Sequence, residues 1–273
     1  YKGMDIASAK PSEEEKKGVP HHLMDFLDRD VTFSAADYVR LARENIDDIL
    51  SRRKLPIIVG GTGLYIDSLL NNVNFSEMKN DEEYRKSLYD FAAENGNEAL
   101  YEKLVSADSK AAEQIHMNNL VRVIRALEVI HVTGRKFSEL KEESRLVESP
   151  YDSLIIGLNA TDRAILYDRI NRRVDIMVEM GLVEEAFELW QSSPMKTAAN
   201  AIGYKELIPY FKKEVSLEEC IDKIKQETRR YAKRQLTWFR RNDSIEWVVT
   251  DDFSKKCEIF EKSEKAIAKY GIM

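Results

Sequence analysis

The sequence feature that most constrains the fold is a strand-sized apolar run that passes directly into a glycine-rich turn. Leu55-Pro56-Ile57-Ile58-Val59 is followed by Gly60-Gly61-Thr62-Gly63 and then by a helical pattern from 64 to about 71. A further helix is predicted before the run, over about 34–51. Buried strands that alternate with long helices are typical of a parallel sheet covered by helices, so the fold class predicted is α/β.

A second predicted strand, at 154–158, supports this interpretation. A helix follows it, with Thr161 or Asp162 as N-cap and Gly181 as its C-terminal stop. Between the two strands lies a long polar stretch with helical patterns, although a parallel crossover needs only about a dozen residues. We therefore predict a core of residues 1–75 and 150–273 and a helical insertion domain at 76–149.

Composition narrows the class of protein. The 273 residues are 43% hydrophobic and 33% charged, with a net charge of −6, as in a soluble globular protein. No apolar run is long enough to span a membrane, and the two cysteines lack disulfide or metal spacing. We therefore expect a cytoplasmic protein without a membrane partner, and no metal-ligand set is identifiable. A monomer is expected.

A basic and aromatic segment at 228–241 stands out in this acidic chain. On a helix, Arg230, Arg234, Thr237 and Arg241 form one stripe, with Lys233 beside it. Ile224, Thr228, Tyr231 and Leu236 lie toward a more apolar side. Interleaved cations and aromatic rings are typical of an RNA-facing helix. A surface helix with solvated arginines is the alternative.

Two further groups of arginines are candidate anion sites. Arg122 and Arg125 share a helix side and could grip phosphate, or could pair with Glu128 as ordinary surface arginines. Three more arginines lie within one helical turn, where a diphosphate would relieve their mutual repulsion. Asp168 and Asp175 could instead neutralise them. This second group consists of Arg169, Arg172 and Arg173.

The segment Tyr231-Ala232-Lys233-Arg234-Gln235-Leu236-Thr237-Trp238-Phe239-Arg240 resembles the YAKRQxTWFR signature of the tRNA dimethylallyltransferase (isopentenyltransferase) family. Other blocks resemble that family in the same order along the chain. They are 1–6, 9–11, 19–25, 33–38, 55–65, 122–128 and 201–206. The resemblance covers most of the chain, is weak at about 76–115 and is loose after about 245. It implies a P-loop-NTPase-like core, and the absence of a zinc finger makes the chain similar to bacterial members.

The resemblance also implies roles for particular residues. The family transfers a dimethylallyl group from dimethylallyl diphosphate to the N6 amine of the adenine 3′-adjacent to the anticodon in tRNA, with Mg²⁺. The resemblance implies that Thr62, beside Gly61, contacts this adenine. It also implies that Arg173, with Arg169 nearby, contacts the diphosphate. The implied tRNA contacts also include Arg122, Val123, Ile124 and Arg125 and, on the basic helix, Arg230, Lys233, Arg234 and Arg241. The insertion at 76–149 is expected to bind the anticodon stem-loop.

One family element does not occur in the sequence. No G-x-x-x-x-G-K-[ST] phosphate-binding loop is found, and the Asp block expected to supply the general base precedes the family's Tyr-x-Gly-Met-Asp motif, with which this sequence opens. We expect a further N-terminal segment in the native protein; without one the chain should be inactive. Two alternatives stay open: a non-catalytic RNA-binding fragment, and an adenine-nucleotide isopentenyltransferase that makes cytokinins.

Overall fold

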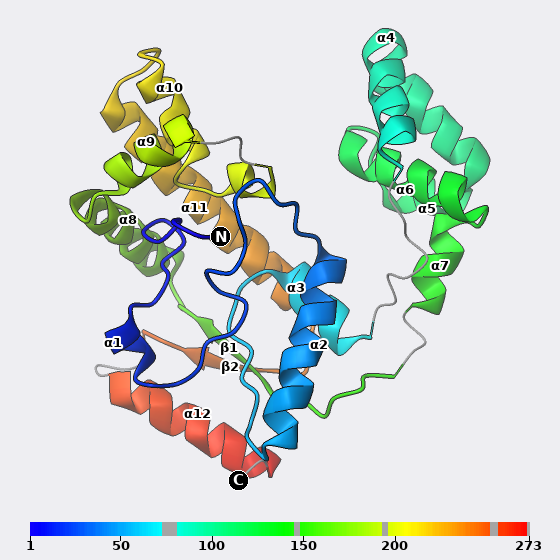
Figure 1. Ribbon diagram of the computed structural model, residues 1–273. Coiled ribbons are helices and arrows are strands. Elements are labelled where there is room, and N and C mark those ends of the chain that lie inside the picture. The colour runs from blue at the N-terminus through cyan, green and yellow to red at the C-terminus, as the bar shows by residue number, and fades with distance from the viewer. Residues whose placement is uncertain (73–80, 145–147, 193–195, 252–255, 272–273) are drawn as a thin grey trace. The chain divides into compact units, whose positions relative to one another are not determined.

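The computed structural model describes residues 1–72, 81–144, 148–192, 196–251 and 256–271. The chain divides into two compact units, one formed by 1–66 with 153–273 and the other by 67–152 (Figure 1). The first unit contains the sheet, and the second consists of helices in its described part.

The sheet has two parallel strands in the described residues, β1 (Ile155–Asn159) and β2 (Ile245–Val249). Their register pairs Ile155 with Ile245 and Asn159 with Val249. At Gly157 a Cβ would lie 2.7 Å from the ring of Trp247 on the paired position, so only glycine lets this ring lie across β1. The strand predicted at 154–158 is thus confirmed, one residue later, and it pairs in parallel, although with a segment that was not predicted as a strand.

The strand predicted at 55–59 is wrong. Its residues have no strand partner in the described part of the chain, and Val59 is 91% exposed. A strand exists only where a neighbour satisfies its backbone groups, so an apolar run without a partner forms no strand. The α/β class therefore holds only in a reduced form, as a mostly helical structure with a small parallel sheet.

The helices of the first unit begin where the sequence places capping residues. Ser34 caps α2 (Ala35–Ser51), and Ser216 caps α11 (Leu217–Phe239). In each case the backbone N–H of the serine also donates to the acidic side chain three residues later, which completes a capping box. Asp162 caps α8 (Arg163–Glu179), as predicted. The other helical elements of this unit are α1 (Glu13–Lys16), α9 (Leu182–Ser192), η1 (Thr197–Asn200), η2 (Lys205–Leu207), α10 (Ile208–Phe211) and α12 (Lys256–Tyr270). Helix α3 (Gly63–Leu70) leads from this unit into the second.

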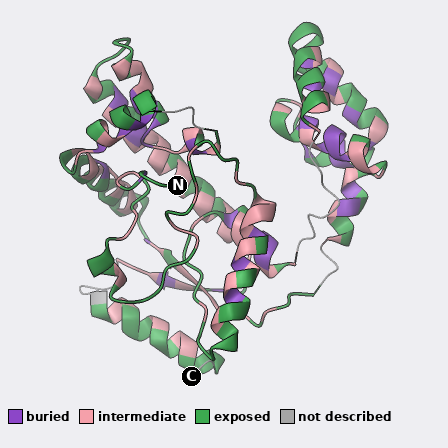
Figure 2. Cartoon of the chain, in the orientation of Figure 1, coloured by how far each residue is buried: buried purple, intermediate pink, exposed green. Residues whose placement is uncertain are grey.

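The core of the first unit lies among α8, α9 and α11 (Figure 2). Leu182, Ala186 and Leu189 follow helical spacing on α9 and are nearly inaccessible, and Ile224 of α11 packs in the same cluster. Met4 joins them, which fixes the N-terminal segment to this core. The core thereby sets the position of α11, the helix with the basic segment.

The second unit consists of α4 (Glu82–Ala107), α5 (Ser109–Gln114), α6 (Leu120–Thr133) and α7 (Phe137–Glu143) in its described part. Gly96, with φ of 87°, interrupts α4. Asp108 is buried where α4 meets α5, and its carboxylate accepts bonds from the backbone of Ala111 and from Ser138. Burial opposes its charged form, but these bonds hold its pKa below the usual value.

Candidate nucleic-acid interface

The glycine turn lies directly against α11. A Cβ on Gly61 would be 1.7 Å from Nε2 of Gln235, and one on Gly63 would be 2.3 Å from Cδ1 of Trp238. Both distances are far inside van der Waals contact, but the end of the Gln235 side chain can turn aside, whereas the Trp238 ring would have to move as a whole. Gly63 is therefore required by the close approach of the turn to α11.

Thr62, between these glycines, has an exposed side chain. Its Oγ1 lies 3.4 Å from Oη of Tyr231 on α11, and its backbone carbonyl accepts the first bond of α3 from Tyr65. A hydroxyl can donate one hydrogen bond and accept two, so this pair of hydroxyls retains capacity for a polar ligand. The arrangement suits the edge of a nucleobase, which presents donors and acceptors side by side.

The exposed side of α11 carries Arg230, Lys233 and Arg234, as the stripe predicts. Arg230 forms an ion pair of 2.7 Å with Glu227, and the guanidinium carbon of Arg234 lies 5.7 Å from the centroid of the Tyr231 ring. Exposed ion pairs of this kind contribute little, so Arg230 is available to exchange Glu227 for a phosphate.

Arg241 is not on the helix, contrary to the predicted stripe. Helix α11 ends at Phe239, and Arg241 lies in the turn that follows. Its guanidinium carbon is 5.9 Å from the centroid of the Trp238 ring. The helical spacing therefore applies to the other cations, whereas Arg241 is oriented by the turn and by contact with this ring.

Of the three arginines on α8, one has no partner in the described chain. Arg169 donates to the Thr250 hydroxyl at 2.8 Å, and Arg172 pairs with Asp168. Arg173 is exposed and unpaired there, because Asp175 pairs at 2.6 Å with Lys225 of α11 instead. Local neutralisation thus accounts for Arg172 and leaves Arg173 free to bind an anion.

On α6, part of the predicted RNA contact must be corrected. Arg122 is exposed, but Val123 and Ile124 are each 1% exposed and belong to the core of the second unit. Alternate helix faces point into and out of a core, so consecutive positions cannot all face a ligand. The side chains of Val123 and Ile124 are therefore structural in this conformation.

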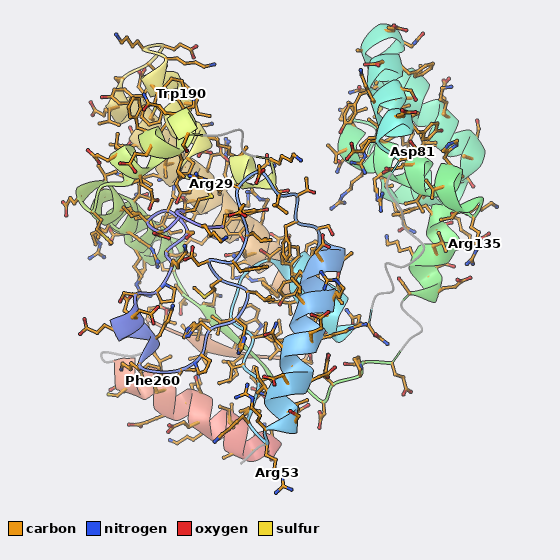
Figure 3. The ribbon with its side chains drawn as sticks, in the orientation of Figure 1. Arg29, Arg53, Asp81, Arg135, Trp190 and Phe260 are labelled. Atoms are coloured by element: carbon orange, nitrogen blue, oxygen red, sulfur yellow. The ribbon has the colours of Figure 1, made fainter. Side chains whose placement is uncertain are left out.

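Arg125 follows the alternative of pairing with Glu128. The Glu128 carboxylate is fully buried and accepts from Arg125 at 2.8 Å, from Arg85 at 2.9 Å and from the backbone of Asp81 at 2.9 Å. Burial disfavours its charge, but the two guanidinium groups and the amide hold its pKa below the usual value. Glu128 thus holds α6 to the N-terminus of α4, where Asp81 lies, and Arg125 adds an ion pair within α6 (Figure 3).

Sequence patterns missed Glu185, which organises the N-terminal segment. Its carboxylate accepts from the backbone N–H groups of Asp5 and Ile6 at 3.0 and 3.1 Å and from the Tyr204 hydroxyl at 2.7 Å. Burial and this carboxylate raise the pKa of Tyr204. No signal in the amphipathic sequence of α9 separates Glu185 from its exposed neighbour Glu184, because the partners are distant in sequence.

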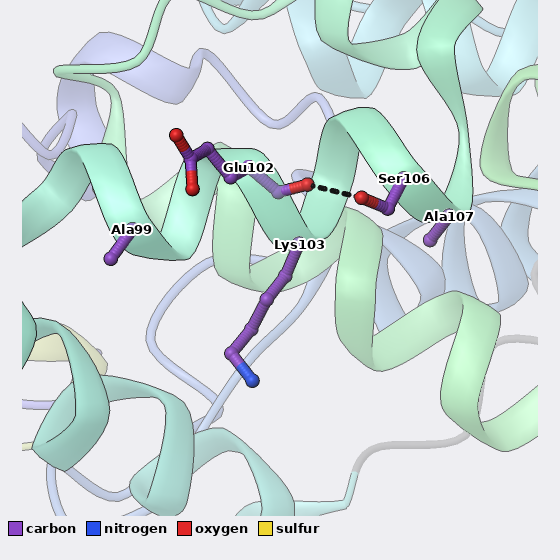
Figure 4. Close-up of a pocket in the computed structure, with 5 residues that line it drawn as sticks. All are labelled: Ala99, Glu102, Lys103, Ser106 and Ala107. Atoms are coloured by element: carbon purple, nitrogen blue, oxygen red, sulfur yellow. Dashed lines mark hydrogen bonds between the residues drawn. The ribbon is translucent and has the colours of Figure 1, made fainter.

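Other features of the structure do not form a site. A shallow hollow lined by Ala99, Glu102, Lys103, Ser106 and Ala107 lies along α4, where the Ser106 hydroxyl is bonded to the Glu102 carbonyl (Figure 4). Within the described ranges no three His, Cys, Asp or Glu side chains are grouped to hold a metal ion. No helix described here has both the length and the apolar character needed to cross a membrane.

Comparison with known proteins gives consistent matches over most of the chain. The family model described as IPP transferase matches residues 1–242. The protein named tRNA dimethylallyltransferase from Thermoanaerobacter sp. (strain X514) is 48% identical over 273 residues, covering 99% of this chain and 85% of its own length. Its counterpart from Bacillus subtilis (strain 168) is 48% identical over 266 residues, covering 95% of this chain and 84% of its own.

Solved structures match as well. The full-length tRNA isopentenylpyrophosphate transferase from Bacillus halodurans is 45% identical with a TM-score of 0.70, covering 99% of this chain and 84% of its own. A eukaryotic dimethylallyltransferase described as acting on tRNA is 28% identical with a TM-score of 0.80, covering 98% of this chain and 69% of its own.

Proposed function

The chain belongs to the IPP transferase family, and on that premise we propose that it prenylates tRNA. The reaction moves a dimethylallyl group from dimethylallyl diphosphate to the N6 amine of the adenine 3′-adjacent to the anticodon. A bond forms between N6 and the allylic carbon, the carbon–oxygen bond to diphosphate breaks, and N6 loses one proton to a base. The observation that carries the proposal is the Thr62 hydroxyl beside Tyr231, on the helix with the exposed cations.

Thr62 and Arg173 take separate roles in this proposal. An adenine amine is a weak nucleophile, so it must leave its stack and be held in a fixed orientation. The exposed Thr62 hydroxyl supplies a hydrogen bond to the base edge. Arg173, which has no partner among the described residues, offers its guanidinium to the diphosphate, whose negative charge grows as it departs. Arg169 is bonded to Thr250 and would have to exchange that bond to join Arg173.

The family resemblance also implies Mg²⁺, which commonly neutralises the charge of a diphosphate. The residues that the structure describes do not supply a grouped set of carboxylates for such an ion. The roles proposed for this chain's residues therefore do not depend on Mg²⁺.

Binding of the anticodon stem-loop is proposed to use the exposed side of α11, together with Arg122 and the helices of 76–149. Phosphate contacts release counterions, so each one contributes a slope of about 0.7–0.9 to the dependence of log affinity on log salt. Replacing Arg230, Lys233 and Arg234 together by alanine should weaken binding and flatten this slope. The measurement is hairpin RNA affinity at several salt concentrations. An unchanged slope would mean that these side chains do not meet phosphates.

The activity is tested by single-turnover reaction of the protein with dimethylallyl diphosphate and an anticodon stem-loop RNA, followed by mass spectrometry of the RNA. The expected product carries one added prenyl group on the target adenine. RNA that is bound but never modified by the native full-length protein would favour the non-catalytic RNA-binding alternative. Modification of free adenosine monophosphate in preference to the RNA would favour the adenine-nucleotide alternative. A cytoplasmic monomer stays a prediction.

A further inference from the structure

Another side of α11 meets α8 in a small recess that no role assigned above explains. Lys233 and Leu236 of α11, and Arg240 at its C-cap, line the recess together with Arg163 and Tyr167 near the start of α8. Leu166 and Thr237 complete the lining. All of these residues belong to the first unit.

Three cations line this recess, and none has a partner among the residues described. Arg163, Lys233 and Arg240 are exposed and have no hydrogen bond or ion pair from their side chains there. Further along the same two helices, by contrast, the charged groups are satisfied: Lys225 pairs with Asp175, and Arg229 donates to Asn171 at 2.6 Å. Along the α8–α11 contact, the charged side chains are thus paired in one part, whereas the three cations at the other end have no described counter-ion.

The nearby acids are already engaged by backbone groups. Asp162 accepts from the N–H of Ala164 at 2.7 Å as the cap of α8, and Asp251 accepts from the N–H of Thr161 at 2.9 Å. The pKa of Asp251 is lowered mainly by this backbone bond. Neither carboxylate pairs with a cation of the recess, so the charge of the cluster is open to an external anion.

The size of the recess decides what can enter. Its free volume is about 20 Å³, and a site needs roughly 10–15 Å³ to hold one water-sized group. A nucleobase or a prenyl chain therefore cannot enter, whereas one phosphate oxygen can. Leu166, Tyr167 and Leu236 add apolar side chains to the lining beside the three cations.

We propose that this recess binds one backbone phosphate of the RNA, gripped by Arg163, Lys233 and Arg240. The proposal rests on the proposed function. The same chemistry could recognise the diphosphate of the prenyl donor, but two observations favour RNA. Lys233 is shared with the exposed RNA-facing side of α11, and Arg163 and Arg173 are ten positions apart on α8, roughly 15 Å along a helix.

The test measures affinity for an anticodon stem-loop hairpin by fluorescence anisotropy at several salt concentrations. The variants are Arg163→Gln, Arg240→Gln and the double variant. The matched control is Arg53→Gln, since Arg53 projects from the end of α2 (Figure 3). Because the cations share one phosphate, the double variant should lower the salt slope by about 0.7–0.9. Its loss of affinity should be less than the sum of the two single losses.

The two phosphate sources are separated by measuring donor binding on the same variants. RNA affinity reduced at least fivefold in the double variant, with unchanged affinity for dimethylallyl diphosphate, supports the proposal. RNA affinity and slope equal to those of Arg53→Gln overturn it, as does a loss confined to the donor. Arg163→Lys, which keeps the charge, should retain most of the slope, and melting curves confirm that each variant folds. If the unaltered protein binds no hairpin, the proposed function itself fails.

Discussion

Replacing Glu185 should destabilise the first unit, because one half-buried carboxylate satisfies three donors. Bonds to a charged group contribute about 1.5–3 kcal/mol each, but these three share one carboxylate that water still reaches. We therefore expect Glu185→Ala to lower the free energy of unfolding by about 3 kcal/mol. For a unit of this size, that corresponds to a fall in Tm of roughly 6–12 °C. Glu185→Gln should lose less, because its amide oxygen in the position of Oε2 can still accept from the backbone of Asp5 and Ile6, and only the charge is removed.

The assay is tryptophan fluorescence during heating. All three tryptophans, at 190, 238 and 247, belong to the first unit, so the signal reports its unfolding separately from that of the second. Trp190 is on the same helix as Glu185 (Figure 3). Tyr204→Phe should lower Tm less, since it removes one donor and leaves both backbone bonds. The control is Glu184→Ala, on the exposed neighbour. A Tm for Glu185→Ala equal to that of Glu184→Ala would refute the reasoning.

Three further predictions concern catalysis and acid stability. In an active protein, Thr62→Ala should slow single-turnover prenylation by about tenfold, the value of one neutral hydrogen bond, with little change in donor affinity; a normal rate at saturating substrate would remove Thr62 from the adenine site. Arg173→Ala should raise the donor's half-saturation concentration by about tenfold or more, and normal donor use would assign Arg173 to the surface. The pKa values of Glu128 and Asp108 are lower in the folded protein than the unfolded values of about 4.3 and 3.9. Their ionisation therefore stabilises the fold at any pH above the unfolded values, and this stability is lost as the pH falls through the folded values. Glu128→Gln should therefore lower neutral-pH stability and make acid unfolding, followed by circular dichroism, less steep; an unchanged acid limb would contradict this.

Local sequence signals predicted the helices better than the sheet. Ser34, Asp162 and the period of α11 specify helix starts and faces through bonds within a few residues, and the structure has them where predicted. A strand depends on a distant partner. The segment 55–59 has the stronger apolar pattern but no described partner. Strand β2 was missed because it pairs with residues some ninety positions earlier, which its own sequence does not indicate.

The candidate site shows the same division. The spacing on α11 correctly placed Arg230, Lys233 and Arg234 on the exposed side. It could not show that α11 ends before Arg241. On α6 the spacing offered both an RNA contact and a pair with Glu128 for Arg125, and could not show that Glu128 is buried and takes this pair. Both outcomes depend on termination and packing, which charge periodicity does not encode. The roles of the site residues in RNA and donor binding stay predictions.

The contact of Gly61 and Gly63 with α11 also limits how the protein can change. A side chain at 63 would occupy the space of the Trp238 ring, so the two positions share one volume. Gly63→Ala alone should therefore damage the protein, whereas the same change combined with a smaller residue at 238 should restore it. Among relatives, bulk at one position should be matched by its loss at the other. The glycine turn and α11 thus form a single inherited unit, which divergence can alter only by paired steps.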